Sequence, residues 1–276
     1  MTLPIDVVLV RHGESEGNVA NHLSRHGDNS AFTQEFLARH SSRFRLSALG
    51  REQAIATGEW LRQEFLSVRP ERNGALFDRH YTSEYVRAME TAGLLGLPSA
   101  RWYANPSLRE RNWGDMEVLP GDERRARFGE SVAMKKCEPL LWTPPNGESI
   151  VDVCERIDRV LDTLHRETRD FQRVIIVCHG EVMWAFRVRL ERLSEREYKR
   201  LDLSKDPHDR IHNCQILHYS RRDPATELTY PYANWMRSVC PLNTTLSSNE
   251  WRQIVRQTFT NEELLARVGK TKPMLE

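Results

Sequence analysis

The sequence contains no run of apolar residues long enough to cross a bilayer, which takes about 20 such residues in a row. The apolar run closest to the N-terminus covers only residues 5–10, and no small-residue cleavage site follows it. A secretory signal peptide has a longer apolar segment and such a site. We therefore expect a cytoplasmic protein that does not interact with membranes.

An excess of one charge is also missing, because 40 Lys and Arg residues stand against 39 Asp and Glu residues, for a formal net charge of +1. Overall charge thus favours neither nucleic acid nor an anionic membrane, and any anion must be bound by a local cluster of cations. Cysteine is scarce, and the five cysteines form no C-x-x-C motif. We expect neither a disulfide framework nor a metal site.

What the sequence does contain is a regular alternation of predicted strands and helices. Two β-branched apolar runs, residues 6–10 and 173–178, have the composition of strands that are buried on both faces, and a weaker strand candidate covers residues 77–83. Helical patterns cover residues 47–66, 85–95, 149–168 and 181–193. This alternation predicts an α/β fold, a three-layer sandwich with a mostly parallel central sheet and helices on both faces.

Two internal segments depart from this pattern. Residues 20–44 are polar and rich in His and Ser, which predicts a long loop or a small helical insertion. Residues 117–147 hold charged, helix-like pieces and end in a Pro-Pro-Asn-Gly turn. We interpret this second segment as a lid over the site, because ligands of such sheets bind beyond the carboxyl ends of the strands.

The last part of the chain changes character after residue 221, where prolines recur and no clear strand is predicted. Two helix starts are indicated there, at Ser247 and at Thr260, each followed three residues later by a glutamate. We expect residues 1–220 to form one domain. Residues 221–276 should form a C-terminal extension that is packed on this domain or appended to it.

The most informative motif is the string Leu9-Val-Arg-His-Gly-Glu-Ser-Glu-Gly-Asn18, which directly follows a predicted strand. Arg11 and His12 therefore emerge side by side at a strand end. A neutral imidazole nitrogen can attack phosphorus, and the planar fork of an arginine can hold phosphate oxygens. This string resembles the signature of the histidine phosphatase superfamily, whose fold is phosphoglycerate-mutase-like. The resemblance implies that His12 is the nucleophile that becomes phosphorylated, that Arg11 binds the phosphoryl oxygens, and that Asn18 is a further contact.

Three later strings match the same family in the same order. They are Tyr81-Thr-Ser-Glu-Tyr-Val-Arg-Ala-Met-Glu-Thr-Ala92, Leu108-Arg-Glu-Arg-Asn-Trp-Gly-Asp-Met-Glu117 and Val177-Cys-His-Gly-Glu181. The resemblance implies that Arg87 binds phosphate, that Glu110 protonates the leaving oxygen, and that His179 stabilises the transferring phosphoryl group. Two positions depart from the family pattern: Cys178 replaces a common serine, and Val118 stands where glycine is frequent.

The resemblance implies a hydrolase, namely a metal-independent histidine phosphatase that acts on a small phosphate ester through a phosphohistidine and needs no cofactor. Two alternatives stay open: a phosphoglycerate mutase-type phosphoryl transfer, and a non-catalytic phosphate-binding or scaffold protein on the same fold. The mutase lid pattern, Arg-Arg-Ser followed by a triple proline, is not found. A scaffold usually loses a site residue, whereas here every expected one is present. No motif identifies the substrate or the oligomeric state.

Overall fold

The computed structural model of the chain describes residues 2–68, 75–167 and 172–274, and its described strands form one seven-stranded sheet in the order β3-β2-β4-β1-β5-β6-β7. The strands are β1 (Asp6–Arg11), β2 (Arg79–Thr82), β3 (Trp102–Ala104), β4 (Arg173–Cys178), β5 (Ile216–Ser220), β6 (Trp235–Val239) and β7 (Arg252–Gln253). Strands β3, β2, β4 and β1 pair in parallel, whereas β5, β6 and β7 continue the sheet in antiparallel pairs.

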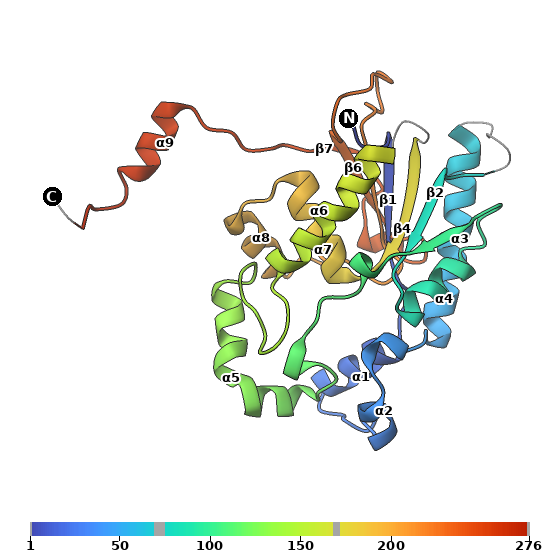
Figure 1. The fold of residues 1–276 in the computed structure, drawn as a ribbon, viewed down its shortest axis with the longest axis vertical. Helices are drawn as coiled ribbons and strands as arrows, with labels where there is room; N and C mark the ends of the chain where they lie inside the picture. The colour runs from blue at the N-terminus through green and yellow to red at the C-terminus, as the bar shows by residue number, and fades with distance from the viewer. Residues whose placement is uncertain (1, 69–74, 168–171, 275–276) are drawn as a thin grey trace.

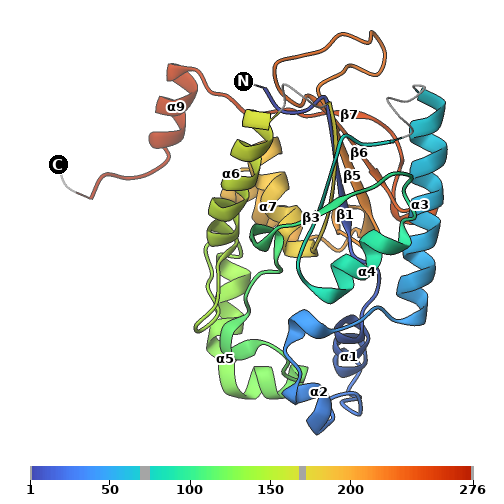
Figure 2. The same ribbon diagram turned by 45° about the vertical axis from the view of Figure 1, so that its right-hand side comes forward.

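Helices cover both faces of this sheet (Figures 1 and 2). The described helices are α1 (Glu16–Arg25), α2 (Gln34–Ala38), α3 (Ala48–Val68), α4 (Val86–Leu94), α5 (Gly121–Cys137), α6 (Ile150–Glu167), α7 (Gly180–Glu191), α8 (Glu195–Asp202) and α9 (Asn261–Val268). Helices α3 and α4 lie on one face, and α6 and α7 lie on the other (Figure 2). The predicted three-layer α/β fold is therefore confirmed. Residue 168, the last of one predicted helix, lies outside the described residues.

The position of strand β1 inside the sheet explains why residues 7–10 form an unbroken apolar run. Successive side chains of a strand point to opposite faces. Val8 and Val10 accordingly join the core cluster under α3 and α4, while Val7 and Leu9 join the cluster under α6 and α7. All four side chains are buried, so neither face leaves room for a polar residue.

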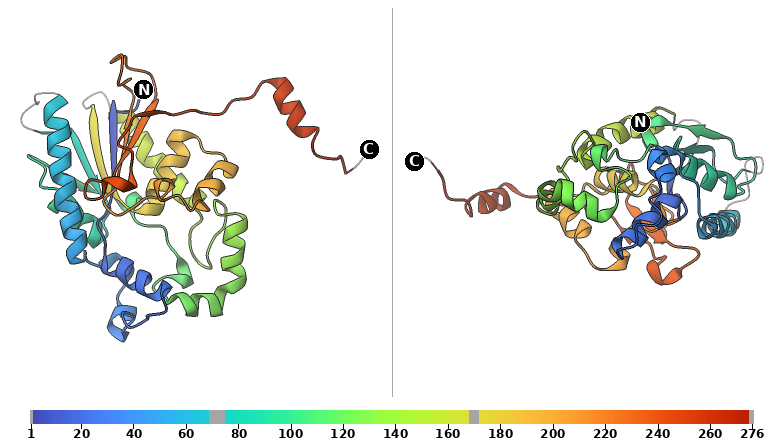
Figure 3. Two further views of the ribbon diagram at one scale, coloured as in Figure 1. Left: turned by 180° about the vertical axis from the view of Figure 1, so that it is seen from behind. Right: turned by 90° about the horizontal axis from the view of Figure 1, so that it is seen from below.

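The carboxyl ends of β1, β2 and β4 meet at one edge of the sheet. Arg11 pairs with Cys178 at the end of β1 and β4, and Thr82 pairs with Val177 at the end of β2. The residues that follow these strands must therefore lie close together. Helices α1, α2 and α5 stand beyond this edge, below the sheet in Figures 1 and 2, and from below they spread across it (Figure 3).

The segment of residues 20–44 is a helical insertion rather than a long loop. It contains the end of α1, the short helix α2 and a 3-10 turn at Ser41–Arg43. Helix α1 begins at a capping box, in which Ser15 Oγ accepts from Asn18 N and the Asn18 side chain accepts from Ser15 N. Helix α2 has a simpler N-cap, in which the hydroxyl of Thr33 accepts from Phe36 N at 3.2 Å.

The expectation that no strand follows residue 221 is wrong, because β6 and β7 lie in the extension and β6 pairs with β5 along five residue pairs. The strand signal of β6 is masked by a charged residue at its centre. Arg237 is nevertheless buried, since its guanidinium lies 5.2 Å from the centre of the Trp60 ring, 4.7 Å from that of Trp251, and 2.6 Å from Glu64. The division of the chain at residue 220 stays a prediction.

Of the two helix starts expected in the extension, only the one at Thr260 is confirmed. Ser247 begins no helix, and its hydroxyl instead accepts a hydrogen bond from Cys240 N at 2.8 Å. Thr260 and Glu263 form the capping box of α9, which projects away from the body of the molecule (Figures 1 and 3). Within residues 2–68, 75–167 and 172–274, no helix combines the length and apolar character that a membrane span requires.

Gly58 allows α3 to pack directly against the end of α4, because a Cβ at this position would lie 2.0 Å from the carbonyl oxygen of Leu95. We expect Gly58→Ala to lower the free energy of unfolding by about 2–3 kcal/mol, since the two helices would have to separate. Urea denaturation would measure this change. Gly93→Ala is the matched control, because nothing lies within 4 Å of a Cβ added there. A helical Gly→Ala change without a clash should stabilise by up to about 1 kcal/mol. Equal destabilisation by both substitutions would contradict this account of the packing.

Candidate active site

His12 follows β1 directly and is almost completely buried. Its Nδ1 lies 2.7 Å from the carbonyl oxygen of Gly13, so Nδ1 carries the proton and donates it to that oxygen. The other ring nitrogen, Nε2, accepts a hydrogen bond of 3.1 Å from Arg87 Nε. Burial lowers the pKa of His12 well below its ordinary value, and the charges of Arg87 and Arg11 lower the pKa further. The imidazole is therefore neutral with its lone pair at Nε2, which is the form that a nucleophile needs.

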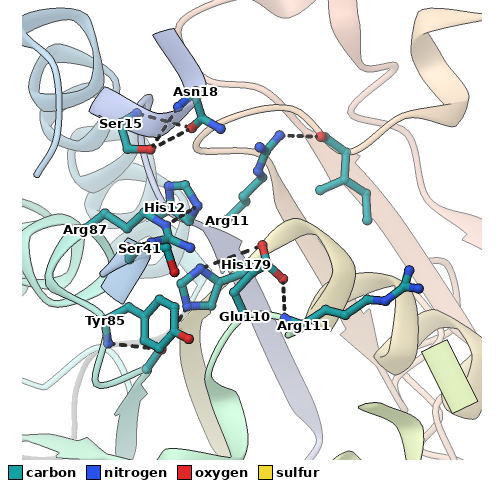
Figure 4. Close-up of polar contacts among 12 residues, drawn as sticks. Arg11, His12, Ser15, Asn18, Ser41, Tyr85, Arg87, Glu110, Arg111 and His179 are labelled. Carbon is teal, nitrogen blue, oxygen red and sulfur yellow. Dashed lines mark hydrogen bonds and ion pairs between the residues drawn. The ribbon is translucent and has the colours of Figure 1, made fainter. Parts of the chain in front are cut away.

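His179 follows β4 in the same way and lies beside His12, with 5.1 Å between the ring centres. Its Nε2 is 2.8 Å from Ser83 Oγ, and its Nδ1 is 3.9 Å from a carboxylate oxygen of Glu110 (Figure 4). Nδ1 has no hydrogen-bond partner among the described residues. Burial lowers the pKa of His179 well below its ordinary value, with a further contribution from Arg87. This ring is thus neutral and leaves one nitrogen free for a further contact.

Two cations flank the histidines, the buried Arg87 and the half-buried Arg11. Arg11 donates from Nη1 to the carbonyl oxygen of Ile211 at 2.8 Å, and its Nε has no partner in the described part of the chain. Arg87 donates from Nη1 to the carbonyl oxygen of Ser41 at 2.8 Å. Neither guanidinium forms an ion pair with a carboxylate of a described residue. Buried charges are normally paired, so these two guanidinium groups create a strong preference for an anion.

Glu110 supplies a carboxyl group on the Nδ1 side of the His179 ring, opposite the side that contacts Ser83. One oxygen accepts a hydrogen bond of 2.9 Å from the backbone N–H of Arg111, and the other faces His179 (Figure 4). Burial raises the pKa of Glu110 to about 6; the charge of Arg87 opposes this shift and that of Glu181 adds to it. A carboxyl group with this pKa can carry a proton near neutral pH and donate it to a reacting oxygen.

Arg111 holds the segment that bears Glu110 in place. Its side chain is completely buried and donates to the carbonyl oxygens of Glu148 and Trp142 at 2.6 and 3.0 Å. Its Nη1 also forms an ion pair of 3.0 Å with Glu181. Nothing in the sequence indicates this role, because an arginine between polar neighbours such as Glu110 and Asn112 usually lies in solvent. The three groups that bury it come from distant parts of the chain.

Asn18 lies at the wall of the site but is engaged in structural hydrogen bonds. Its Oδ1 accepts from the backbone N–H and the hydroxyl of Ser15, and from Asn213 Nδ2 at 3.1 Å. Asn213 also donates to the carbonyl oxygen of His12 at 3.1 Å. Asn18 therefore links the start of α1 to the loop that contacts the backbone of His12. The expected contact between Asn18 and phosphate stays a prediction.

A cavity of about 340 Å³ opens onto these groups. Of the six residues predicted from sequence, five line it: Arg11, His12, Asn18, Arg87 and Glu110. The sixth, His179, is not among the lining residues, since it is fully buried between Ser83 and Glu110. The structure thus brings all six together, with His179 behind the cavity wall.

The same cluster offers possible metal ligands, because donor atoms of His12, Glu110 and His179 lie within 4.8 Å of one another. The charges around them disfavour a metal ion. Arg87 already donates to the free nitrogen of His12, and the guanidinium of Arg11 adds a second positive charge. Cations this close repel a metal ion and attract an oxyanion.

Sequence reasoning assigned no role to Ser83 or Ser41, which hold His179 and Arg87, and it gave the segment of Asn213, which holds the backbone of His12, only a structural one. One signal could have identified Ser83. It stands immediately after β2, as His12 and His179 stand immediately after β1 and β4. Ser41 acts from a segment without any comparable mark, because it uses only its backbone carbonyl to hold Arg87.

Comparison with known proteins gives related sequences and folds. The model of the histidine phosphatase superfamily (branch 1) matches residues 7–225. The 2,3-bisphosphoglycerate-dependent phosphoglycerate mutase of Azorhizobium caulinodans is 30% identical over 207 residues, which cover 72% of this chain and 87% of that protein. The enzyme of the same name from Bartonella henselae is 31% identical over 196 residues, 69% of this chain and 84% of its own.

Solved structures of phosphatases share the fold. Mycobacterial glucosyl-3-phosphoglycerate phosphatase in complex with VO3 aligns with a TM-score of 0.60 and 22% identity, over 91% of this chain and 97% of that one. The alpha-ribazole phosphatase of Shigella flexneri aligns with a TM-score of 0.58 and 21% identity, over 83% and 96% of the two chains. At these identities the likeness concerns the fold alone.

Proposed function

The chain belongs to the histidine phosphatase superfamily (branch 1), and on this premise we propose that it is a metal-independent phosphomonoester hydrolase that works through a phosphohistidine. One observation carries the proposal. The unprotonated Nε2 of a neutral His12, which accepts from Arg87 Nε, lies at a cavity in which the guanidinium groups of Arg11 and Arg87 have no carboxylate partner among the described residues. A nucleophile beside an unoccupied oxyanion site suits attack on a phosphate ester.

The reaction would take place in two transfers. The phosphate oxygens replace Nε2 of His12 as the acceptor of the Arg87 hydrogen bond, which frees the lone pair. Nε2 then attacks phosphorus, the bond from phosphorus to the ester oxygen breaks, and Glu110 protonates the departing alkoxide. A water molecule, which gives a proton to Glu110, attacks the phosphohistidine, releases inorganic phosphate and restores His12. Positive side chains neutralise the phosphoryl charge, the task that metal ions perform in kinases.

The nucleophile can be tested with p-nitrophenyl phosphate in the presence of EDTA. We expect wild-type activity to survive EDTA, and His12→Ala to lose it by at least about 1,000-fold, because the variant lacks the nitrogen that attacks phosphorus. His26→Ala is a suitable control, since His26 is an exposed residue at the end of α1. Nitrophenolate release that persists in His12→Ala would refute the phosphohistidine route.

The proposed role of Glu110 as the acid can be tested in single-turnover experiments with an alkyl phosphate, in which the rate of alcohol release is measured as a function of pH. Glu110 donates a proton only when it is protonated, so the rate should be highest below pH 6 and fall as the pH rises through about 6. His12 stays neutral throughout this range because its pKa is far lower than usual. Glu110→Gln should lower the rate by about 100- to 10,000-fold and abolish the decline with pH.

Nitrophenyl phosphate provides the control within the same experiment, because nitrophenolate leaves without a proton. Its release in Glu110→Gln should fall much less than that of the alkyl alcohol. Equal losses for the two leaving groups would show that Glu110 is not the acid.

A mutase is the second candidate, since curated relatives at 30% and 31% identity carry that name. The first transfer is common to both reactions, and only the acceptor of the second differs. Between the two transfers, a mutase must retain in its site a phosphorylated carboxylic acid, which carries both carboxylate and phosphate charges. Beyond Arg11 and Arg87, Arg124 is the one cation among the described lining residues, whereas Glu117 and Glu181 are acidic. This balance of charge favours release over retention.

The two reactions separate when 3-phosphoglycerate is supplied together with a priming amount of 2,3-bisphosphoglycerate. We expect inorganic phosphate to form from these compounds, with no more than a trace of 2-phosphoglycerate, because the cavity holds few cations to keep the intermediate. Phosphorus NMR resolves the products. Accumulation of 2-phosphoglycerate without phosphate release would make the chain a mutase.

A further inference from the structure

We propose that the alcohol portion of the substrate carries an aromatic ring, which rests on a platform formed by Phe36 and Phe44 of the helical insertion. The inference depends on the proposed phosphatase activity and specifies the class of substrate, an arylalkyl or aryl phosphate ester. It rests on the composition of the cavity wall, on the geometry of the two rings, and on the hydrogen bonds that already occupy the nearby polar groups.

The cavity has two chemically different walls. Charged groups surround His12 at the edge of the sheet, as described above. The lining also contains eight apolar side chains, five of them aromatic: Phe32, Phe36, Phe44, Trp113, Met116, Val118, Trp184 and Ile211. A pocket that joins a charged end to several aromatic side chains matches an amphipathic ligand whose polar group is the phosphate.

The platform is built by α2 and the turn that follows it. Phe36 and Phe44 are stacked, with 4.5 Å between ring centres and an angle of 11° between the rings, and Phe32 contacts Phe36 edge-on at 5.4 Å. Phe44 is buried and rests against Gly17, where a Cβ would lie 2.9 Å from its ring. Phe36 remains half-buried at the cavity. Because Phe44 is held in place and Phe36 is partly exposed, Phe36 offers a surface that a third ring can contact in an offset or edge-on arrangement.

Polar groups near the platform are largely occupied. Asn21 donates to the carbonyl oxygen of Gly17 at 2.8 Å, Glu117 accepts from the hydroxyl of Ser41, and Glu181 is paired with Arg111. Hydroxyl groups of a sugar or a glyceryl unit would find few free partners here, and burying them unpaired is costly. Arg124 is an exception, because its Nε has no partner among the described residues.

The size of the cavity fits this class of ligand. A cavity of about 150 Å³ can bind benzene, so about 340 Å³ accommodates a phosphoryl group together with one ring. The ring contributes through removal of apolar surface from water and through contact with the aromatic platform.

The experiment compares 3-phenylpropyl phosphate with n-propyl phosphate. Both esters release a primary alcohol of similar basicity, so the demands of the chemical step are the same and only the ring differs. We expect kcat/KM of the wild type to be about tenfold higher for the phenyl ester, mainly through a lower KM. A ratio near one would overturn the proposal.

Three variants locate the effect. Phe36→Ala should reduce the ratio to about two or less, and Phe36→Leu should give an intermediate ratio because it retains apolar surface. Leu37→Ala is the matched control, since Leu37 is the next residue of α2 and is exposed. It should keep the full ratio. The value of kcat/KM for n-propyl phosphate should stay within about twofold in all three variants, because the ring platform does not contact the phosphate end.

Each remaining outcome also decides the question. A ratio that Phe36→Ala leaves unchanged, or a parallel loss for both esters, would overturn the platform. If the wild type hydrolyses neither these esters nor p-nitrophenyl phosphate, the proposed phosphatase activity fails instead. The platform is then tested by calorimetric binding of 3-phenylpropyl phosphonate and n-propyl phosphonate, for which the same tenfold ratio in Kd, lost in Phe36→Ala, is expected. Equal affinities would overturn it.

Discussion

The parallel pairing of β1 with β4 is the constraint on which the site depends. Its register places Arg11 opposite Cys178, so that the next residue of each strand is a histidine at the same edge of the sheet. A slip of one residue would turn every side chain of β1 toward the opposite face. The buried valines that fix the register against α3 and α6 thereby also fix the distance of 5.1 Å between the two imidazole rings.

Once the histidines are fixed, the balance of buried charge determines what the site can bind. Backbone carbonyl oxygens of Ile211 and Ser41 orient Arg11 and Arg87 without neutralising them. The carboxylate of Glu181 could have compensated this charge, but Arg111 holds it. Glu110 is left buried with a raised pKa and does not form an ion pair with either arginine. The fold thus keeps a carboxyl group and two cations close together while a place for an oxyanion stays open.

The sequence predicted the parts of the fold and site that depend on local signals. Apolar strands followed by His-Gly marked His12 and His179 as candidates, and the order of four motifs marked Arg87 and Glu110. The structure places all four side by side, and their catalytic roles stay predictions. The strand β6 was missed because Arg237 interrupts its apolar pattern, and only the surrounding Trp60, Trp251 and Glu64 make its burial favourable. Ser41 and Arg111 were missed because their contacts join segments that are far apart in the chain.

In the proposed reaction, the insertion that carries α2 separates selectivity from chemistry. Its turn provides the carbonyl oxygen that orients Arg87, while its phenylalanines face the far part of the cavity. A change in the rings can therefore alter which alcohol fits without moving the sheet edge that holds His12. Gly17 connects the insertion with the sheet edge, because Phe44 packs against this residue of α1, the helix that begins just after the loop following His12. Substrate preference in this chain is thus expected to reside in the insertion, whereas the chemistry resides in the strand ends.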